Sequence, residues 1–345
     1  MNKAKNSVHL VVPGLLGPMP ALMQSEGEMR LPRLEQVLAR SQPSPFPGKS
    51  LEPVVFRLFG VRVDEGRNLP TAAYRRIGDG ASVDERYWLQ ANPVYLRPDQ
   101  DRLLLFDTED LALTRQEASE LAALFNTHFS EEGWQVEVAN PQRWYLPLDR
   151  APDLVTHELT DAFGRNMDLF LPGGGEGFKW HGVLNEIQML FYTSAVNEQR
   201  ESAGKGAISG LWLSGGGRLT DQMAPTFTAL FSNDPLLKGL AATTSLGIHE
   251  PPQQIDQLSA VKGEVLLHYD ALQRPVLCAD PMTWKEEMLR FEAWLSPLID
   301  ALKKGQLDEI RLYPCDGQQY RIDRSALRRF WRRRKPIVAH LDTNQ

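Results

Sequence analysis

The sequence predicts an α/β fold in which a mostly parallel sheet is flanked by helices and a smaller α+β domain is inserted. Near the start of the chain, the apolar run from His9 to Val12 ends at a Pro-Gly pair, which is typical of a buried first strand followed by a loop. The order of strand, glycine-containing loop and helix recurs farther along, as it does in folds with parallel sheets. A central segment instead has two strands, a helix and two strands, which indicates a separate domain.

The elements before the insert start with that first strand. A helix is predicted over residues 31–40, because apolar residues recur there at helical spacing and Pro32 suits the first turn. Residues 41–50, SQPSPFPGKS, are predicted to form a proline-rich connection. Over residues 51–63, the alternation in VVFRLFGVRV favours a strand.

The insert is defined by two strand pairs around one helix. YWLQANPVYL and DRLLLFD are predicted as paired strands around a turn at residues 97–100. In the helix that follows, Thr114 is the N-cap and Glu117 stands three positions later, which is the spacing of a capping box. WQVEVA and RWYLPL supply the other two strands. The predicted boundaries are residues 1–63 and 161–335 for the core, 64–160 for the inserted cap domain and 336–345 for a tail.

The remaining core is predicted from four segments. GVLNEIQMLFYTSAVNEQRESAG is predicted to be one long helix, and the strand GLWL leads into a glycine loop at Ser214–Gly217. GEVLLHYD is predicted to be a strand and MTWKEEMLRFEAWLSPLIDALKKG a helix. DEIRLYPCDG is predicted to be the last strand, ending near Asp316.

Composition excludes several classes of protein. The 345 residues carry a formal net charge of −6, so nucleic acid is not expected as the main partner, because binding phosphates requires a positive field. The two cysteines, Cys278 and Cys315, form no disulfide framework or metal spacing, which favours a reducing cytoplasm. Pro13 and Gly14 interrupt the early apolar run, which argues against a signal peptide. No segment approaches the ~18 apolar residues of a membrane span.

Common catalytic motifs are missing from the sequence. There is no G-x-S-x-G nucleophile elbow, which argues against an α/β-hydrolase. Gly204-Lys205-Gly206 lacks the Ser or Thr of a P-loop. The histidines have no metal-ligand spacing, and only His268 and Asp270, at the end of a strand, form a suggestive pair.

Two segments allow two interpretations each. The Ser214–Gly217 loop exposes backbone N–H groups to an anion, or it is a tight turn that requires positive φ. The tail RSALRRFWRRRK binds nucleic acid or an anionic membrane surface, or it is a helix that docks Leu327, Phe330 and Trp331 while its arginines stay solvated. The docking interpretation is the favoured one.

One stretch, VLNEIQMLFYTSAVNEQRESAGKGAISGLWLSGGG, carries a family resemblance. It is similar to the cofactor-independent phosphoglycerate mutases of the archaeal type, in the alkaline-phosphatase superfamily. Their H-P-V-N-x-x-R-x-x-x-G-K signature corresponds here to Ala195-Val196-Asn197, Arg200, Gly204 and Lys205. The insert resembles that family's cap domain, including Arg143 at the start of a strand. A closer resemblance is to proteobacterial proteins named phosphoglycerate mutase or regulator of pathogenicity factors.

The resemblance also implies that the chain lacks several catalytic groups of that family. The family uses two divalent metal ions, such as manganese or zinc, and a serine nucleophile. Pro13-Gly14 stands where the family has Asp-Gly, and residues 68–72 stand where it has Gly-Ser-Asp-x-Ala. Of the ligand set, Asp270 and Asp316 are the remnants. The resemblance therefore implies an alkaline-phosphatase-like core without a metal cofactor or catalytic residues.

The leading hypothesis is a non-catalytic binding or regulatory protein for a phosphorylated or anionic small molecule. Two alternatives remain: an active phosphoglycerate mutase, which is an isomerase, or a phosphatase with an atypical metal site; and a regulatory protein that binds a protein partner through its basic tail. The expected ligand-binding residues are Asn197, Arg200, Lys205, Ser214, Gly215 and Gly216, with Arg143 from the cap.

Overall fold

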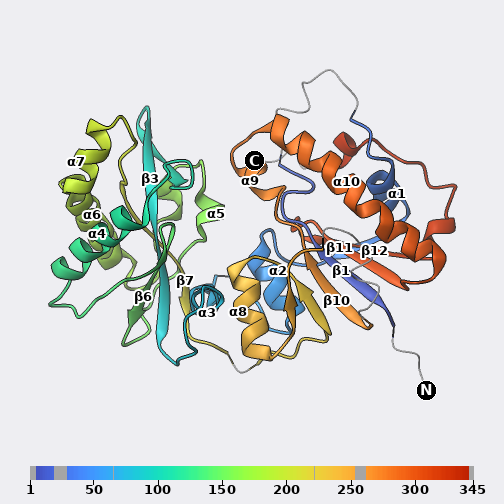
Figure 1. Cartoon of the computed structure of the whole chain (residues 1–345), viewed down its shortest axis with the longest axis horizontal. Coiled ribbons are helices and arrows are strands. Elements are labelled where there is room, and N and C mark those ends of the chain that lie inside the picture. Colours follow the sequence, from blue (N-terminus) through green and yellow to red (C-terminus); the bar gives the residue numbers. More distant parts are fainter. Residues whose placement is uncertain (1–4, 19–28, 65, 221, 253–261, 342–345) are drawn as a thin grey trace. The chain divides into compact units, whose positions relative to one another are not determined.

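A computed structural model describes residues 5–18, 29–64, 66–220, 222–252 and 262–341. The chain forms two compact units, shown in Figure 1. The first comprises residues 1–62, 222–237 and 241–345, and the second comprises residues 63–221 and 238–240. The second unit is thus inserted into the first, and it extends to residue 221, whereas the predicted insert ends at residue 160.

Seven strands of the described residues form one sheet in the first unit, here called the main sheet, in the order β2-β12-β11-β1-β10-β8-β9. Strand β1 (Ser7–Val11) lies between β10 (Glu264–His268) and β11 (Glu309–Tyr313) and is parallel to both. Of the described strands with these pairings, β12 alone runs in the opposite direction, because it pairs antiparallel with β11 on one side and with the edge strand β2 on the other. The predicted α/β class with a mostly parallel sheet is thus confirmed. The other strands are β2 (Gln42–Pro45), β8 (Ala229–Phe231), β9 (Ile248–His249) and β12 (Gln318–Asp323).

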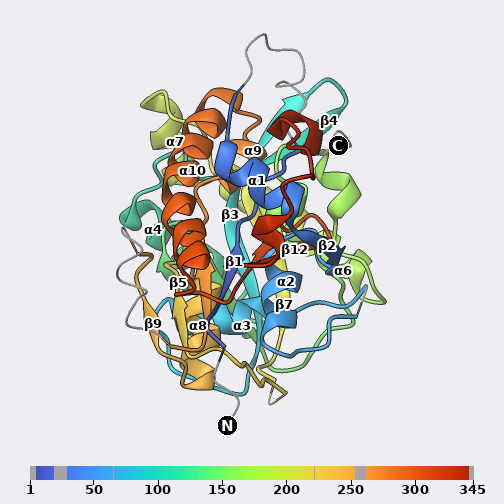
Figure 2. The same cartoon turned by 90° about the vertical axis from the view of Figure 1, so that its right-hand side faces the viewer.

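One face of the main sheet is apolar and covered by two helices. Alternate residues of β1, including Val8 and Leu10, are at most 1% exposed and pack with α1 (Pro32–Arg40) and α10 (Pro281–Lys304). Figures 1 and 2 show these helices over the sheet. Burying each large aliphatic side chain stabilises the fold by about 2 kcal/mol, so this layer supplies the core of the first unit.

The opposite face of the main sheet, here called the polar face, carries most of the polar and aromatic side chains of its strands beside a few aliphatic ones, because strand side chains alternate between faces. The ring of His9 lies against Phe227, which in turn contacts Phe59. Phe59 follows helix α2 (Leu51–Leu58). The predicted strand over residues 51–63 is therefore wrong. Leu51, Val55 and Phe59 are buried at four-residue spacing, which is the spacing of a helix face. The apolar-polar alternation in the sequence therefore does not determine the structure of this segment.

The edge strand β2 is a second difference from the sequence prediction. It lies inside the predicted proline-rich connection and pairs antiparallel with β12. Proline is tolerated here because an edge strand has one side without ladder hydrogen bonds. The predicted last strand is also followed by another, β12. The remaining elements outside residues 63–221 are α8 (Pro235–Thr244), α9 (Gln273–Leu277) and the short 3-10 turns η4 (Ala326–Arg328) and η5 (Ile337–His340).

The second unit contains its own sheet, here called the second sheet, built around the long strand β3. The predicted strand pairs and the helix between them are confirmed, and Thr114 with Glu117 forms the predicted capping box. β3 also pairs with β7, so the described residues give the order β4-β3-β6-β5 with β7 on β3. The elements are β3 (Tyr87–Asp99), β4 (Arg102–Asp107), α4 (Arg115–His128), β5 (Glu137–Asn140), β6 (Arg143–Leu148) and β7 (Gly210–Gly217).

Helices after residue 160 belong to this second unit because they pack on the second sheet. Leu184 and Phe191 share a hydrophobic cluster with Leu213 of β7 and Phe125 of α4. The predicted single helix is two helices, interrupted where Ser194 caps the second one. The elements of the unit outside the sheet are α3 (Thr71–Gly78), α5 (Leu159–Ala162), η2 (Met167–Phe170), α6 (Gly177–Tyr192) and α7 (Ala195–Ser202).

The basic tail does not form the predicted helix. Leu327 is buried, as the docking interpretation requires, but Phe330 and Trp331 are exposed. Only the short turn η4 is present in this segment. The predicted docking of the aromatic pair is therefore wrong.

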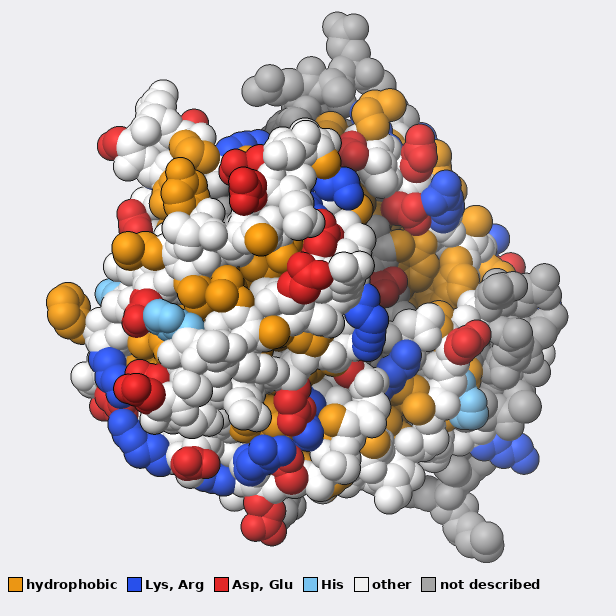
Figure 3. Space-filling view, turned by 60° about the vertical axis from the view of Figure 1, so that its left-hand side comes forward, with side chains coloured by type: hydrophobic (Ala, Val, Ile, Leu, Met, Phe, Trp, Pro, Cys, Tyr) orange, Lys and Arg blue, Asp and Glu red, His pale blue; other side chains and the backbone are white. Residues whose placement is uncertain are grey.

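The surface carries large apolar side chains elsewhere too. Phe178, Met189 and Tyr192 are exposed on α6. Figure 3 shows apolar side chains interspersed with charged ones on the face that it presents. None of the helices that the structure describes is both long enough and apolar enough to cross a membrane.

The loop after β1 depends on one glycine. Gly14 has φ of +80°, and a Cβ atom there would lie 2.5 Å from the carbonyl oxygen of Leu272. Its own carbonyl accepts a hydrogen bond of 2.9 Å from Nε1 of Trp284 on α10. The loop therefore joins the main sheet to the helical layer through close backbone contact.

We expect Gly14→Ala to lower the free energy of unfolding by about 3 kcal/mol or more, because it adds a backbone clash to an unfavourable φ. Urea denaturation followed by circular dichroism measures the loss. Gly317→Ala is the matched control, since Gly317 has φ of +92° and a Cβ atom there would meet no other atom within 4 Å. It should lose only about 1 kcal/mol. Equal losses would contradict the role of the Leu272 contact.

Candidate functional site

The carboxyl edge of the main sheet gathers the segments that the sequence places at a site. β1, β10 and β11 are parallel neighbours, so the segments that follow them emerge at one edge. These segments carry Pro13-Gly14, Asp270 and Asp316 respectively. Ligands of open α/β sheets bind at this edge.

The residues at this edge do not fit a centre with two cations. Oδ1 of Asp316 accepts a hydrogen bond of 2.9 Å from the backbone N–H of Gln318. The Asp270 backbone carbonyl accepts a hydrogen bond from the N–H of Gln273. Within the described ranges, no three His, Cys, Asp or Glu residues are arranged to hold a metal ion. Asp270 and Asp316, the remnants that the resemblance implies, thus belong to no group of three such residues among those described.

Two buried histidines of the main sheet, His9 in β1 and His268 in β10, are uncharged at neutral pH. Burial lowers the pKa of His9 to about 4, and its Nδ1 lies 3.0 Å from the Tyr313 hydroxyl. Burial likewise lowers the pKa of His268, although Asp234 and Asp270 act in the opposite direction. Nδ1 of His268 lies 3.1 Å from Oγ of Ser232. At neutral pH these side chains are neutral and neither contributes a positive charge for an anion.

Asn197, a predicted ligand-binding residue, makes three backbone hydrogen bonds. Its side-chain amide donates to the carbonyls of Phe191 and Ile208, each at 2.8 Å. Its side-chain carbonyl accepts from the N–H of Ile208, also at 2.8 Å. Asn197 is 2% exposed and thus connects the end of α6 to the segment between α7 and β7.

Arg200 is similarly engaged. Its Nη1 donates to Oε1 of Glu117 at 2.9 Å, and its other nitrogens donate to the carbonyls of Gly206 and Leu111, each at 2.8 Å. The side chain is 1% exposed. Burial alone would raise the pKa of Glu117, but hydrogen bonds from Thr114 and Arg200 lower it. Arg200 therefore links α7 to the capping box of α4.

The predicted glycine loop at Ser214–Gly217 is instead the end of strand β7, so the loop prediction is wrong. Ser214 pairs with Gln90 of β3. A Cβ atom at Gly215 would lie 1.9 Å from Oγ1 of Thr71, and one at Gly216 would lie 2.4 Å from the Tyr87 hydroxyl. Glycine is required because other side chains approach the strand closely and because Gly215 has φ of +64°, as the alternative interpretation of a turn with positive φ requires. Gly215 and Gly216 lie at an irregularity in the pairing of β7 with β3, between the paired residues Ser214 and Gly217.

The remaining predicted residues lie in separate surroundings. Nη2 of Arg143 donates to Oδ1 of Asp79 at 2.6 Å, and the Tyr145 hydroxyl donates to Oδ2 of the same carboxylate at 2.7 Å. Oγ of Ser214 lies 3.3 Å from Oε2 of Glu158. Lys205 is exposed. Arg143, Arg200 and Ser214 thus each contact a different carboxylate, and their role in binding an anion stays a prediction.

A cluster that the sequence reasoning missed lies on the polar face of the main sheet. The Glu309 side chain is 0% exposed and accepts hydrogen bonds from three cations. Nε of Arg311 donates to Oε1 at 2.5 Å, while Nε of Arg321 and Nζ of Lys5 donate to Oε2 at 2.5 and 2.7 Å. Three positive charges around one carboxylate leave a local excess of positive charge.

The Glu309 carboxylate is strongly held in its charged form. Burial by itself would raise the pKa of Glu309, but the hydrogen bonds from Lys5, Arg311 and Arg321 outweigh it and lower the pKa to about 2. Arg311 and Arg321 face each other in register across β11 and β12. Directly opposed like charges destabilise a sheet, so the carboxylate is what permits the pair.

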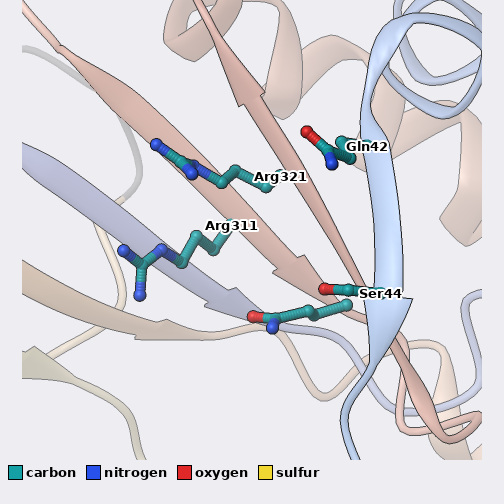
Figure 4. Close-up of a pocket in the computed structure, with 5 residues that line it drawn as sticks. Gln42, Ser44, Arg311 and Arg321 are labelled. Carbon is teal, nitrogen blue, oxygen red and sulfur yellow. The ribbon is translucent and has the colours of Figure 1, made fainter.

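A cavity of about 300 Å³ opens beside these arginines. It is lined by Gln42 and Ser44 of β2, Gln319 and Arg321 of β12, and Arg311 of β11. Figure 4 shows the two arginine side chains running side by side from neighbouring strands. Here this cavity is called the sheet pocket.

One sequence signal could have identified the sheet pocket. In EIRLY, the residues of β11, charged and apolar positions alternate, whereas a parallel strand buried on both faces is a continuous apolar run. The alternation indicates that one face of β11 is not covered by a hydrophobic layer. Which carboxylate pairs with which arginine depends on the register with β12, which the sequence does not reveal.

Comparisons with known proteins concern the fold alone. No protein-family model matches the chain, and no curated protein matches its sequence. The PH0037 protein from Pyrococcus horikoshii is similar in structure with a TM-score of 0.53 and 12% identity, over 92% of this chain and 86% of that one. A cofactor-independent phosphoglycerate mutase from Thermoplasma acidophilum aligns with a TM-score of 0.49 and 13% identity, over 99% and 96% of the two chains.

We expect Glu309 to make stability depend on pH in the acid range. Its folded pKa lies below the unfolded value, so its stabilisation is complete above pH 4.5 and is lost as the pH falls from about 4.5 to about 2. The shift corresponds to about 3 kcal/mol. Unfolding by urea should show a large gap between wild type and Glu309→Gln at pH 7 that narrows towards pH 2.5. Asp99→Asn, which removes an exposed ion pair with Arg102, is the control and should change stability by less than about 1 kcal/mol. A difference in the free energy of unfolding that is the same at all pH values would contradict the lowered pKa of Glu309.

Arg200→Met should destabilise the second unit by about 3–5 kcal/mol, because it leaves a carboxylate and two carbonyls without their donor. Arg102→Met, at an exposed ion pair, should lose less than about 1 kcal/mol. Thermal denaturation of both variants measures the difference. If Arg200→Met keeps wild-type stability, the structural role assigned to this arginine is wrong.

Proposed function

We propose that this chain is a phosphoglycerate-mutase-like protein that binds a small anionic or phosphorylated ligand without transforming it. The sheet pocket is the proposed binding site. The observation that carries the proposal is the buried Glu309 carboxylate, which holds Arg311 and Arg321 side by side and leaves their cluster with excess positive charge.

The geometry of the sheet pocket suits a phosphate group. Each arginine binds Glu309 through Nε, and within the described chain the terminal nitrogens of Arg321 have no hydrogen-bond partner. Guanidinium groups bind phosphate oxygens through paired, charge-assisted hydrogen bonds. Gln42, Ser44 and Gln319 add neutral donors around the same cavity. Its volume of about 300 Å³ is at the lower end of small-molecule sites.

The absence of catalysis is supported by the chemistry around the candidate nucleophile. Thr71 stands within residues 68–72, where the resembling family carries its nucleophile. It is 0% exposed, and its hydroxyl donates to Oε1 of Glu158 at 2.5 Å. In the sheet pocket the lining includes no imidazole, thiol or carboxylate among the described residues, so Ser44 has no adjacent base. Both observations favour binding over turnover.

The residues predicted from the resemblance form a less favourable site. Binding an anion at Arg200 would require its guanidinium to leave Glu117 and two carbonyls, all in a buried setting. The sheet pocket needs no such rearrangement, since Arg321 is half exposed.

Titration calorimetry with inorganic phosphate and with 3-phosphoglycerate tests the proposal. We expect wild type to bind at least one of them and Arg321→Gln to weaken binding at least about tenfold, because a hydrogen bond to a charged group contributes about 1.5–3 kcal/mol. Arg102→Gln, a change of equal charge at an exposed ion pair, should leave the affinity unchanged.

Three outcomes would contradict this proposal. Affinity that falls in Arg143→Gln but not in Arg321→Gln would place the ligand among the residues of the family resemblance. If the wild-type chain binds neither anion, the proposal that the sheet pocket is an anion-binding site is wrong. Interconversion of phosphoglycerates by the purified chain with added manganese or zinc would establish an active mutase instead.

A further inference from the structure

The segment from Arg324 to Lys335 is the most basic part of the chain. It contains six arginines and one lysine, and no Asp or Glu occurs from residue 324 to residue 341. The chain as a whole has a formal net charge of −6, so this positive charge is strictly local. Neither the proposed ligand nor the fold explains it.

This segment is anchored to the first unit at several points. Leu327 within the segment and Ile337, two residues after its end, are both buried. Nη1 of Arg332 donates to the carbonyl of Ser41 at 2.7 Å, and Nη1 of Arg40 donates to the carbonyl of Leu327. The segment between the anchors therefore has a defined position on the surface rather than a free end.

Two large aromatic side chains stand exposed between the anchors. Phe330 is 82% exposed and Trp331 is 67% exposed. Their ring centroids lie 5.4 Å apart with the planes at 81°, so the rings pack edge to face against each other. An exposed apolar cluster rimmed by charges marks a binding surface.

The arginines around this aromatic pair are available to a partner. No ion pair joins Arg328, Arg333 or Arg334 to a carboxylate anywhere in the ranges that the structure covers, and all three are exposed. The unneutralised charge and the apolar pair thus lie on the same short stretch of chain.

We propose that residues 324–335, here called the basic segment, dock the chain on an anionic phospholipid membrane. Phe330 and Trp331 enter the boundary between headgroups and acyl chains, where amphipathic aromatic side chains are favoured. The arginines around them bind lipid phosphates. This proposal does not depend on the sheet pocket or its ligand.

The geometry of the aromatic pair in the basic segment favours lipid over nucleic acid. Single-stranded nucleic acids bind on aromatic platforms whose ring faces accept a base. Phe330 and Trp331 use each other as partners in an edge-to-face pair, which forms a compact apolar projection instead.

Cosedimentation of the full chain with large vesicles tests the proposal. We expect binding to vesicles of phosphatidylcholine with about a third phosphatidylglycerol and none to phosphatidylcholine alone, with affinity falling as salt is raised. Each basic residue near an anionic surface strengthens binding by about fivefold, which is about 1 kcal/mol. The variant Arg328→Gln/Arg333→Gln/Arg334→Gln should therefore bind about 100-fold more weakly.

Two control variants test whether vesicle binding depends on the basic segment or on exposed aromatic residues and arginines in general. Phe330→Ser/Trp331→Ser should weaken vesicle binding at least tenfold, whereas Phe178→Ser/Tyr192→Ser, at two other exposed aromatics, should not. Arg102→Gln/Arg150→Gln/Arg290→Gln removes the same charge from exposed arginines that already contact carboxylates, and should leave binding unchanged. Circular dichroism confirms that each variant is folded.

Other results would overturn the proposal. Equal loss of vesicle binding in the two arginine variants would show a net-charge effect without a docking surface. Tighter binding of oligo(dT) or poly(U) than of vesicles, lost in the Phe330→Ser/Trp331→Ser variant, would identify a single-strand nucleic-acid surface. Absence of vesicle binding by wild type would also refute it. Arg321→Gln should bind vesicles normally, so failure of the sheet pocket and failure of the basic segment are distinguishable.

Discussion

The buried carboxylate of Glu309 is the contact on which the polar face of the main sheet depends. β11 and β12 bring two arginines into direct register, which is unfavourable without a negative charge between them. Glu309 supplies that charge on the same strand face and also receives Lys5, which precedes β1. One side chain thus connects three strands of the sheet and creates the positive surface at the pocket. A hydrophobic residue at this position would remove both effects.

Similar pairs organise the second unit. Arg143 contacts Asp79, Arg200 contacts Glu117, and Arg75 contacts Glu158. Each pair joins segments that are far apart in the sequence. Motif residues that resemble a phosphate site in the sequence therefore have structural partners, because an arginine suited to a phosphate is equally suited to a carboxylate. The type of residue alone does not distinguish the two uses.

Local signals predicted much of the fold, whereas properties that depend on tertiary contacts were not predicted. The capping box at Thr114 and the first strand depend on neighbours within a few residues, and both were identified. Residues 51–58 carry apolar side chains that satisfy a strand period and a helix period, so burial decides between them. The sequence predicts a loop at Gly215, because residue type does not reveal that Thr71 approaches its backbone. The sequence predicts Asn197 and Arg200 as ligand-binding residues, but it does not reveal the carbonyls and the carboxylate that they contact in the fold.

The prolines of β2 have a consequence for the edge of the main sheet. Two of the four residues in this strand, Pro43 and Pro45, have no N–H, so β2 offers an incomplete ladder to any incoming strand. Addition of another polypeptide, whether from a misfolded copy or a growing aggregate, is therefore disfavoured there. Gln42 and Ser44 of the same strand line the sheet pocket, so the edge that is protected against self-assembly is also a wall of the proposed binding site.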